Sequence, residues 1–146
     1  MRVISLQSGS NGNCIYVETD GVRLLFDAGI SGIQAQKRLE LHGRDVTSVD
    51  AVLISHDHVD HSRSMGIYHR KFGLPVYVTA DTHRAASRYK LGEIEDIGHF
   101  SAGESLRFGR IVVETSTTPH DGAPAKPETG RAEEKWRPAE RDENDP

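Results

Sequence analysis

The stretch 51-AVLISHDHVDHS-62 decides the fold, because an apolar run ends there in a cluster of histidines and aspartates. The run Ala51 to Ile54, within a segment beginning at Val49, is typical of a strand covered on both faces. Positions 56 to 61 then hold three histidines and two aspartates. Since α/β proteins build sites where strands end in loops, the segment predicts either a metal site or a solvated, histidine-rich loop.

The spacing within the cluster favours the metal site. Side chains two apart in an extended segment point to the same side, so His56 and His58 can meet one ion. If a helix begins near Asp60, then Asp60 and His61 point differently and can serve a second ion. Imidazole and carboxylate groups suit Zn²⁺, and also Mn²⁺ or Fe²⁺. Four potential ligands in this order after a buried strand outweigh the interpretation as a solvated loop.

Outward from the cluster, predicted strands come first as a hairpin and then alternate with helices. Two β-branched and aromatic runs flank Asp20-Gly21, a strong hairpin signal. Ser31 is expected to cap a helix that ends at Gly43, with Ile33, Leu39 and Leu41 facing inward. Further elements are expected at 62–72 (helix), 74–78 (strand), 81–89 (helix) and 111–115 (strand). This order predicts an α/β (α+β) fold with a mixed β-sheet and flanking helices.

The composition divides the chain of 146 residues at position 121. Apolar segments recur over residues 1–121, whereas residues 122–146 contain no Val, Ile, Leu, Met or Phe and hold four of the six prolines. We expect one domain over 1–121 and a charged, disordered tail over 122–146, since such a segment buries too little surface to offset its ordering entropy.

The remaining composition restricts the class of protein. The net charge of −4 is mild and spread out, which indicates neither a surface that coats nucleic acid nor a strongly acidic one. The N-terminus has no long apolar region of a signal peptide, and no run approaches a membrane span. The single cysteine, Cys14, fits a reducing compartment. We expect a cytoplasmic protein without a membrane partner.

The segment HDHVDH (56–61) matches the H-x-H-x-D-H signature of the metallo-β-lactamase-fold hydrolases. The resemblance extends through SGSNGNCIYVETDGVRLLFDAG (8–29), the helix after it, the stretch 51–79 and TTPHDGA (117–123). Together these segments look most similar to the bacterial branch of WalJ-like (YycJ-like) exonucleases. The resemblance covers residues 1 to about 123.

The resemblance implies a role for each motif residue. His56, His58 and the later His120 would bind a first metal, and Asp60 and His61 a second one. Asp60 is also the expected catalytic residue. Asp27 matches the family's first acidic motif, which orders the metal loop by hydrogen bonds without binding the metal.

The resemblance also implies a fold and a reaction. The family fold is a four-layer αββα sandwich of two similar halves, of which this chain resembles only the first. We therefore expect one complete zinc site and an incomplete second site. The implied activity is that of a metal-dependent hydrolase of the phosphodiesterase or nuclease type, using a metal-activated hydroxide on nucleic acid or a small phosphodiester. The alternative is a truncated, catalytically inactive metal-binding fragment, or a subunit that depends on a partner.

Several other features receive structural interpretations. A half sandwich would leave one sheet face uncovered, so a homo-oligomer or a partner covering that face is expected.

Cys14 is expected to be a buried structural thiol. The turn SGSNGN (8–13) favours tight-turn chemistry, with backbone N–H groups contacting a substrate phosphate as the weaker alternative. The histidines that match no motif are expected on the surface or in packing roles: His42, His69, His83 and His99.

Overall fold

The computed structural model describes residues 1–55, 59–89, 91–119 and 132–138 of the chain. Its larger sheet has six strands in the order β1-β2-β3-β4-β5-β6. The strands are β1 (Arg2–Gln7), β2 (Cys14–Thr19), β3 (Val22–Phe26), β4 (Ala51–Leu53), β5 (Val76–Thr79) and β6 (Ile97–Phe100). The first three pair antiparallel and the last four pair parallel. The predicted mixed sheet is therefore confirmed.

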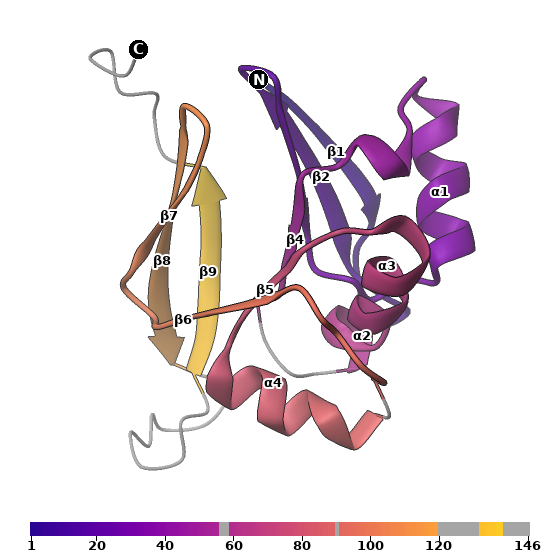
Figure 1. The fold of residues 1–146 in the computed structure, drawn as a ribbon. Coiled ribbons are helices and arrows are strands. Elements are labelled where there is room, and N and C mark those ends of the chain that lie inside the picture. The colour runs from indigo at the N-terminus through magenta and orange to yellow at the C-terminus, as the bar shows by residue number, and fades with distance from the viewer. Residues whose placement is uncertain (56–58, 90, 120–131, 139–146) are drawn as a thin grey trace.

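Helices cover one face of this sheet (Figure 1). They are α1 (Gly32–Leu41), α2 (Val59–Ser62), α3 (Met65–Phe72) and α4 (Ala80–Ala86), with 3₁₀ turns at Val46–Ser48 and Ser87–Tyr89. The Ser31 side chain accepts a hydrogen bond from the Gln34 N–H and caps α1 as predicted. The core between sheet and helices contains fully buried Tyr16, Leu25 and Tyr68.

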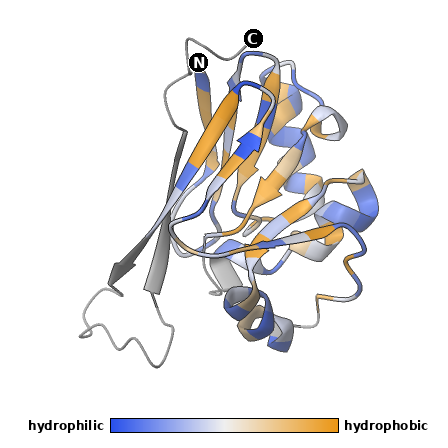
Figure 2. Ribbon diagram, turned by 60° about the vertical axis from the view of Figure 1, so that its left-hand side comes forward, coloured by the Kyte–Doolittle hydropathy of each residue, from blue (hydrophilic) through white to orange (hydrophobic). Residues whose placement is uncertain are grey.

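A second, antiparallel sheet lies against the other face of the first (Figure 1). It has the order β7-β8-β9, formed by β7 (Ser105–Phe108), β8 (Ile111–Pro119) and β9 (Ala132–Pro138). Leu24 and Leu53 of the first sheet pack with Ile111 and Val113 of the second. Figure 2 shows apolar strands at the centre of the molecule and more polar residues on the helices. The layers are helix, sheet, sheet.

The structure contains strands that the sequence analysis did not predict. β6 and β7 are short and partly exposed, so they carry little apolar periodicity. β9 lies within the segment 122–146 for which disorder is expected; the rest of that segment is outside the described residues. β9 pairs with β8 from Val113–Pro138 to Pro119–Ala132. Such a pairing is formed by backbone hydrogen bonds along an open strand edge, and amino-acid composition does not predict those bonds.

The apolar face of the first sheet extends beyond the second sheet. Val3 pairs with Val17 and Ile15 with Phe26, and Val17 and Phe26 belong to the core between the sheets. Because cross-strand partners share a face, Val3 and Ile15 lie on the same side, where they remain 56% and 37% exposed. The expectation of a covering partner or second copy stays a prediction.

Within the described ranges, no helix is both long and apolar enough to cross a bilayer.

Candidate metal site

Asp27 directly follows β3 and has a left-handed backbone conformation. Its φ angle is +72°, in the left-handed region that L residues other than Asn and Asp rarely adopt. The Asp27 N–H donates to the Leu53 carbonyl at 2.7 Å, which ties the end of β3 to the end of β4. The side chain is buried. The conformation directs the carboxylate toward the segment that follows β4.

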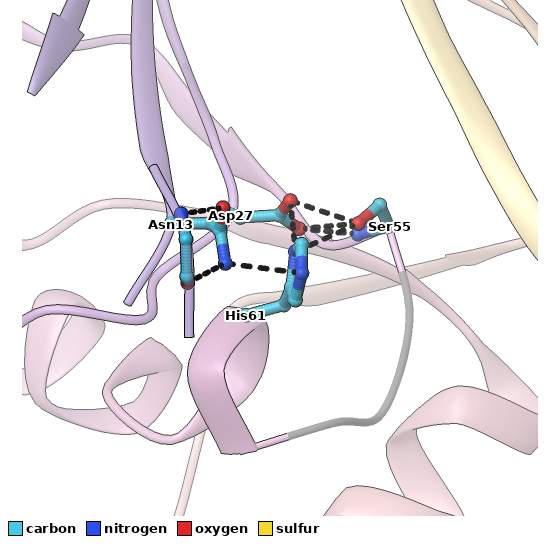
Figure 3. Close-up of polar contacts among 5 residues, drawn as sticks. Asn13, Asp27, Ser55 and His61 are labelled. Atoms are coloured by element: carbon cyan, nitrogen blue, oxygen red, sulfur yellow. Dashed lines mark hydrogen bonds and ion pairs between the residues drawn. The ribbon is translucent and has the colours of Figure 1, made fainter. Parts of the chain in front are cut away.

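The Asp27 carboxylate contacts Ser55, the residue before the histidine cluster, and His61, the last residue of the cluster (Figure 3). At the start of the cluster, Ser55 donates its backbone N–H to Oδ1 at 2.7 Å and its hydroxyl at 2.8 Å. At the other end, the His61 Nδ1 lies 2.7 Å from Oδ2. Residues 56–60 are thus bracketed by two residues bound to one carboxylate. The family resemblance implies an ordering role for Asp27, and that role stays a prediction.

His61 is fixed by its backbone as well as by its ring. It lies in α2, where the predicted helix begins, and its carbonyl accepts from the Ala28 N–H at 2.6 Å. The Ser64 N–H in turn donates to the Ala28 carbonyl at 2.9 Å. The backbone of Ala28, the residue after Asp27, is therefore hydrogen-bonded to the turn that contains His61 through both its N–H and its carbonyl.

Asn13 contacts the second nitrogen of the His61 ring, and the sequence analysis did not select it. Its Nδ2 lies 3.1 Å from His61 Nε2. The amide orientation follows from Gly9, whose N–H donates to Oδ1 at 3.0 Å and whose carbonyl accepts from Nδ2 at 2.9 Å. Nδ2 is thus the donor and Nε2 the acceptor, so the imidazole carries its proton on Nδ1, facing Asp27.

This tautomer fits metal binding. A metal-ligating histidine typically donates one ring N–H to a carboxylate and uses the other nitrogen, unprotonated, as the ligand. His61 has this arrangement, with Asp27 as the carboxylate and Nε2 carrying the lone pair. The unprotonated Nε2 of His61 is therefore a suitable ligand atom for a divalent ion such as Zn²⁺.

The other expected ligands cannot be located. His56, His58 and His120 lie outside the described residues, and so does the side chain of Asp60, whose backbone belongs to α2. Among the side chains that are described, no three His, Cys, Asp or Glu residues gather as a metal cage. The metal set and the catalytic role of Asp60 remain predictions.

The turn at residues 8–13 uses its backbone groups internally. The Gly9 N–H is bound by Asn13, and the Gly12 N–H donates to the Gly9 carbonyl at 3.2 Å. These contacts favour the tight-turn interpretation over a phosphate cradle. From the sequence alone, Ser55 stands out only as a polar residue next to the histidine cluster. Asn13 stands out only as a polar residue of the glycine-rich turn.

Gly12 should be the most sensitive position of this turn. Its φ is +139°, and an added Cβ would lie 2.6 Å from the Gly29 carbonyl oxygen and 2.8 Å from Ile30 Cγ2. Gly9 has φ +116° with nothing within 4 Å of an added Cβ. Because Gly12→Ala adds overpacking to backbone strain, we expect it to lower the free energy of unfolding by about 1–3 kcal/mol more than Gly9→Ala. Urea denaturation would measure both; equal losses would contradict the crowding.

Cys14 and His69 have the structural roles that the sequence suggests. Cys14 is fully buried, and burial raises the pKa of its thiol to about 12, which makes it a poor nucleophile. The Nδ1 of His69 lies 3.0 Å from the Leu74 carbonyl oxygen, and its Nε2 accepts from the Glu95 N–H at 3.2 Å.

Comparison with known proteins gives a consistent result. A model of the metallo-beta-lactamase superfamily matches residues 8–137. The chain is 38% identical over 120 residues to exodeoxyribonuclease YycJ of Bacillus anthracis, covering 81% of this chain and 45% of that protein. It is 37% identical over 119 residues to exodeoxyribonuclease WalJ of Streptococcus pneumoniae, covering 80% and 44%. The chain thus spans about 45% of the length of these curated relatives.

Solved structures agree on the fold. A B3 metallo-beta-lactamase with an active-site glutamic acid aligns with a TM-score of 0.63 at 18% identity, covering 75% of this chain and 47% of that one. A metallo-beta-lactamase from Cronobacter sakazakii aligns with a TM-score of 0.63 at 19% identity, covering 76% and 50%. The predicted fold class is therefore confirmed.

Proposed function

Because this chain belongs to the metallo-beta-lactamase superfamily, we propose that it is a metal-dependent phosphodiesterase of the nuclease type. One observation carries the proposal: the Asp27 carboxylate fixes Ser55 and His61 at the two ends of the H-x-H-x-D-H segment and sets the metal-binding tautomer of His61. The relatives named exodeoxyribonucleases favour DNA as the substrate class.

The proposed ligands fall into two sets. His56, His58 and His120 would hold one divalent ion, and Asp60 with His61 would contribute to a second position. An ion held there would acidify water and neutralise charge on a phosphoryl oxygen. Asp27 would hold His61 in place, and Ser55 would hold the backbone immediately before His56. These positioning contacts reduce the reorganisation needed when substrate binds.

The proposal is tested by cleavage of 5′-labelled DNA and of bis(p-nitrophenyl) phosphate by the purified chain. We expect hydrolysis in Zn²⁺ or Mn²⁺ that is abolished by chelation with EDTA and restored by adding the metal back. His69→Ala should leave the hydrolysis unchanged, because both ring nitrogens of His69 have structural partners.

The same assay separates the proposal from the alternative role. A chain that binds zinc stoichiometrically but cleaves neither substrate would be a metal-binding or partner-dependent protein. That result would refute the proposed activity. Cleavage that persists in EDTA would refute its dependence on metal.

A further inference from the structure

Asn13 is held rigidly at the edge of the proposed metal site. It directly precedes β2, and its amide makes two hydrogen bonds to the backbone of Gly9, one as acceptor and one as donor. Its own carbonyl accepts from the Gly29 N–H at 2.9 Å, close to the Asp27-Ala28 segment. The side chain therefore has little freedom to rotate away.

The second N–H of this amide is directed at the atom that would bind a metal. Asn13 Nδ2 is 3.1 Å from His61 Nε2, on the side of the ring opposite Asp27 (Figure 3). Nε2 has one lone pair in the plane of the ring. An N–H donor and a metal ion cannot both use that lone pair, so the hydrogen bond and coordination exclude each other.

We infer that Asn13 is a positioning residue that donates a hydrogen bond to His61 Nε2 and competes with a metal ion for the lone pair of that nitrogen. This hydrogen bond keeps the proton of His61 on Nδ1, so the ring is already in the ligating tautomer. Metal binding at His61 would break the Asn13–His61 hydrogen bond, so the surroundings of the Asn13 side-chain amide would change with metal occupancy. The inference rests on the proposed function only in requiring His61 as a ligand.

Zinc titration of three variants tests the competition. Removing one net hydrogen bond of about 0.5–1.5 kcal/mol corresponds to about 2- to 10-fold. Asn13→Ala should therefore lower the apparent Kd for Zn²⁺ by about that factor in calorimetric titration. Asn13→Asp keeps an acceptor for the Gly9 N–H but cannot donate to Nε2, so its Kd should also fall. The control is Asn11→Ala, an exposed asparagine of the same turn, which should leave the Kd unchanged.

A second measurement uses the unmodified protein and does not depend on the folding of a variant. In ¹⁵N-resolved NMR spectra, addition of Zn²⁺ should shift the Asn13 side-chain NH₂ signals and the Nε2 signal of His61 together. The NH₂ signals of Asn11 should not shift. An Asn13 signal that stays in place while the Nε2 signal shifts would overturn the inference, as would an unchanged or raised Kd in both Asn13 variants.

A His61→Ala arm separates this inference from the proposed function. If His61→Ala and the unmodified chain bind the same amount of zinc equally tightly, His61 is no ligand, and both the second metal position and the inference fall. If zinc binds at His61 and the Asn13 effects appear without any phosphodiester cleavage, the inference stands and the proposed function fails.

Discussion

Asp27→Ala is expected to lower the free energy of unfolding by about 4 kcal/mol or more. The substitution leaves three donors without their acceptor: the Ser55 N–H, the Ser55 hydroxyl and the His61 Nδ1–H. A buried polar group without a partner costs about 1–3 kcal/mol. Alanine at φ +72° adds about 1–2 kcal/mol of backbone strain. Urea or thermal denaturation of the metal-free protein measures the sum.

Two matched variants separate the contributions to this loss. Asp20 also has a positive φ, of 51°, but lies on the exposed turn between β2 and β3. Asp20→Ala should therefore cost about 1–2 kcal/mol, mainly as strain. Asp27→Asn tolerates the backbone conformation and keeps one acceptor oxygen, so its loss should fall between the two. If Asp27→Ala costs no more than Asp20→Ala, the carboxylate does not hold the loop.

The same residue connects stability to the site. Ser55 immediately precedes His56, and His61 ends the motif, so one carboxylate binds the residue before the motif and orients a proposed ligand within it. Removing a hydrogen bond to a metal-ligating residue typically reduces metal affinity by about 10- to 100-fold. Asp27→Asn should show this loss of zinc affinity even where its stability is largely retained.

The sequence predicts the parts of the fold that carry strong local signals. The apolar run at Ala51–Ile54, the Asp20-Gly21 hairpin and the Ser31 cap all occur in the structure because they depend on local periodicity and turn chemistry. The buried face of α1 was predicted less well. Leu39 is buried, whereas Ile33 and Leu41 are 55% and 83% exposed. Ala35 is buried on the inward face of α1, and so small a side chain does not stand out in a pattern of large apolar residues.

The candidate site likewise has features that the sequence indicates and contacts that it does not. The spacing of the histidine cluster is a property of the sequence, so the proposal of a metal site and of an ordering role for Asp27 needs no structure, and both stay predictions. The contact of Asn13 with His61 joins residues 48 positions apart, and it arises only when the turn at residues 8–13 folds back over α2. Strand β9 likewise depends on pairing with β8 and has no apolar pattern of its own. Such long-range contacts need the three-dimensional structure.

Replacing His56 and His58 together with alanine is expected to abolish zinc binding at the first site, from about one ion per chain to none. Neither residue is among those that the structure describes, but the residues on either side of them are. Ser55, directly before His56, donates two hydrogen bonds to Asp27, and α2 begins at Val59, directly after His58. Removing two of three proposed imidazole ligands leaves too few donors to retain Zn²⁺.

Equilibrium dialysis followed by metal analysis measures this loss, and the chain offers a matched control. His83 on α4 and His99 on β6 form an exposed pair with ring nitrogens 3.0 Å apart, so they could bind zinc adventitiously. The double variant His83→Ala, His99→Ala should retain one tightly held ion, because we expect the zinc to be held by the histidines of the motif. If this control loses the zinc while the His56→Ala, His58→Ala variant keeps it, the motif does not form the metal site of this chain.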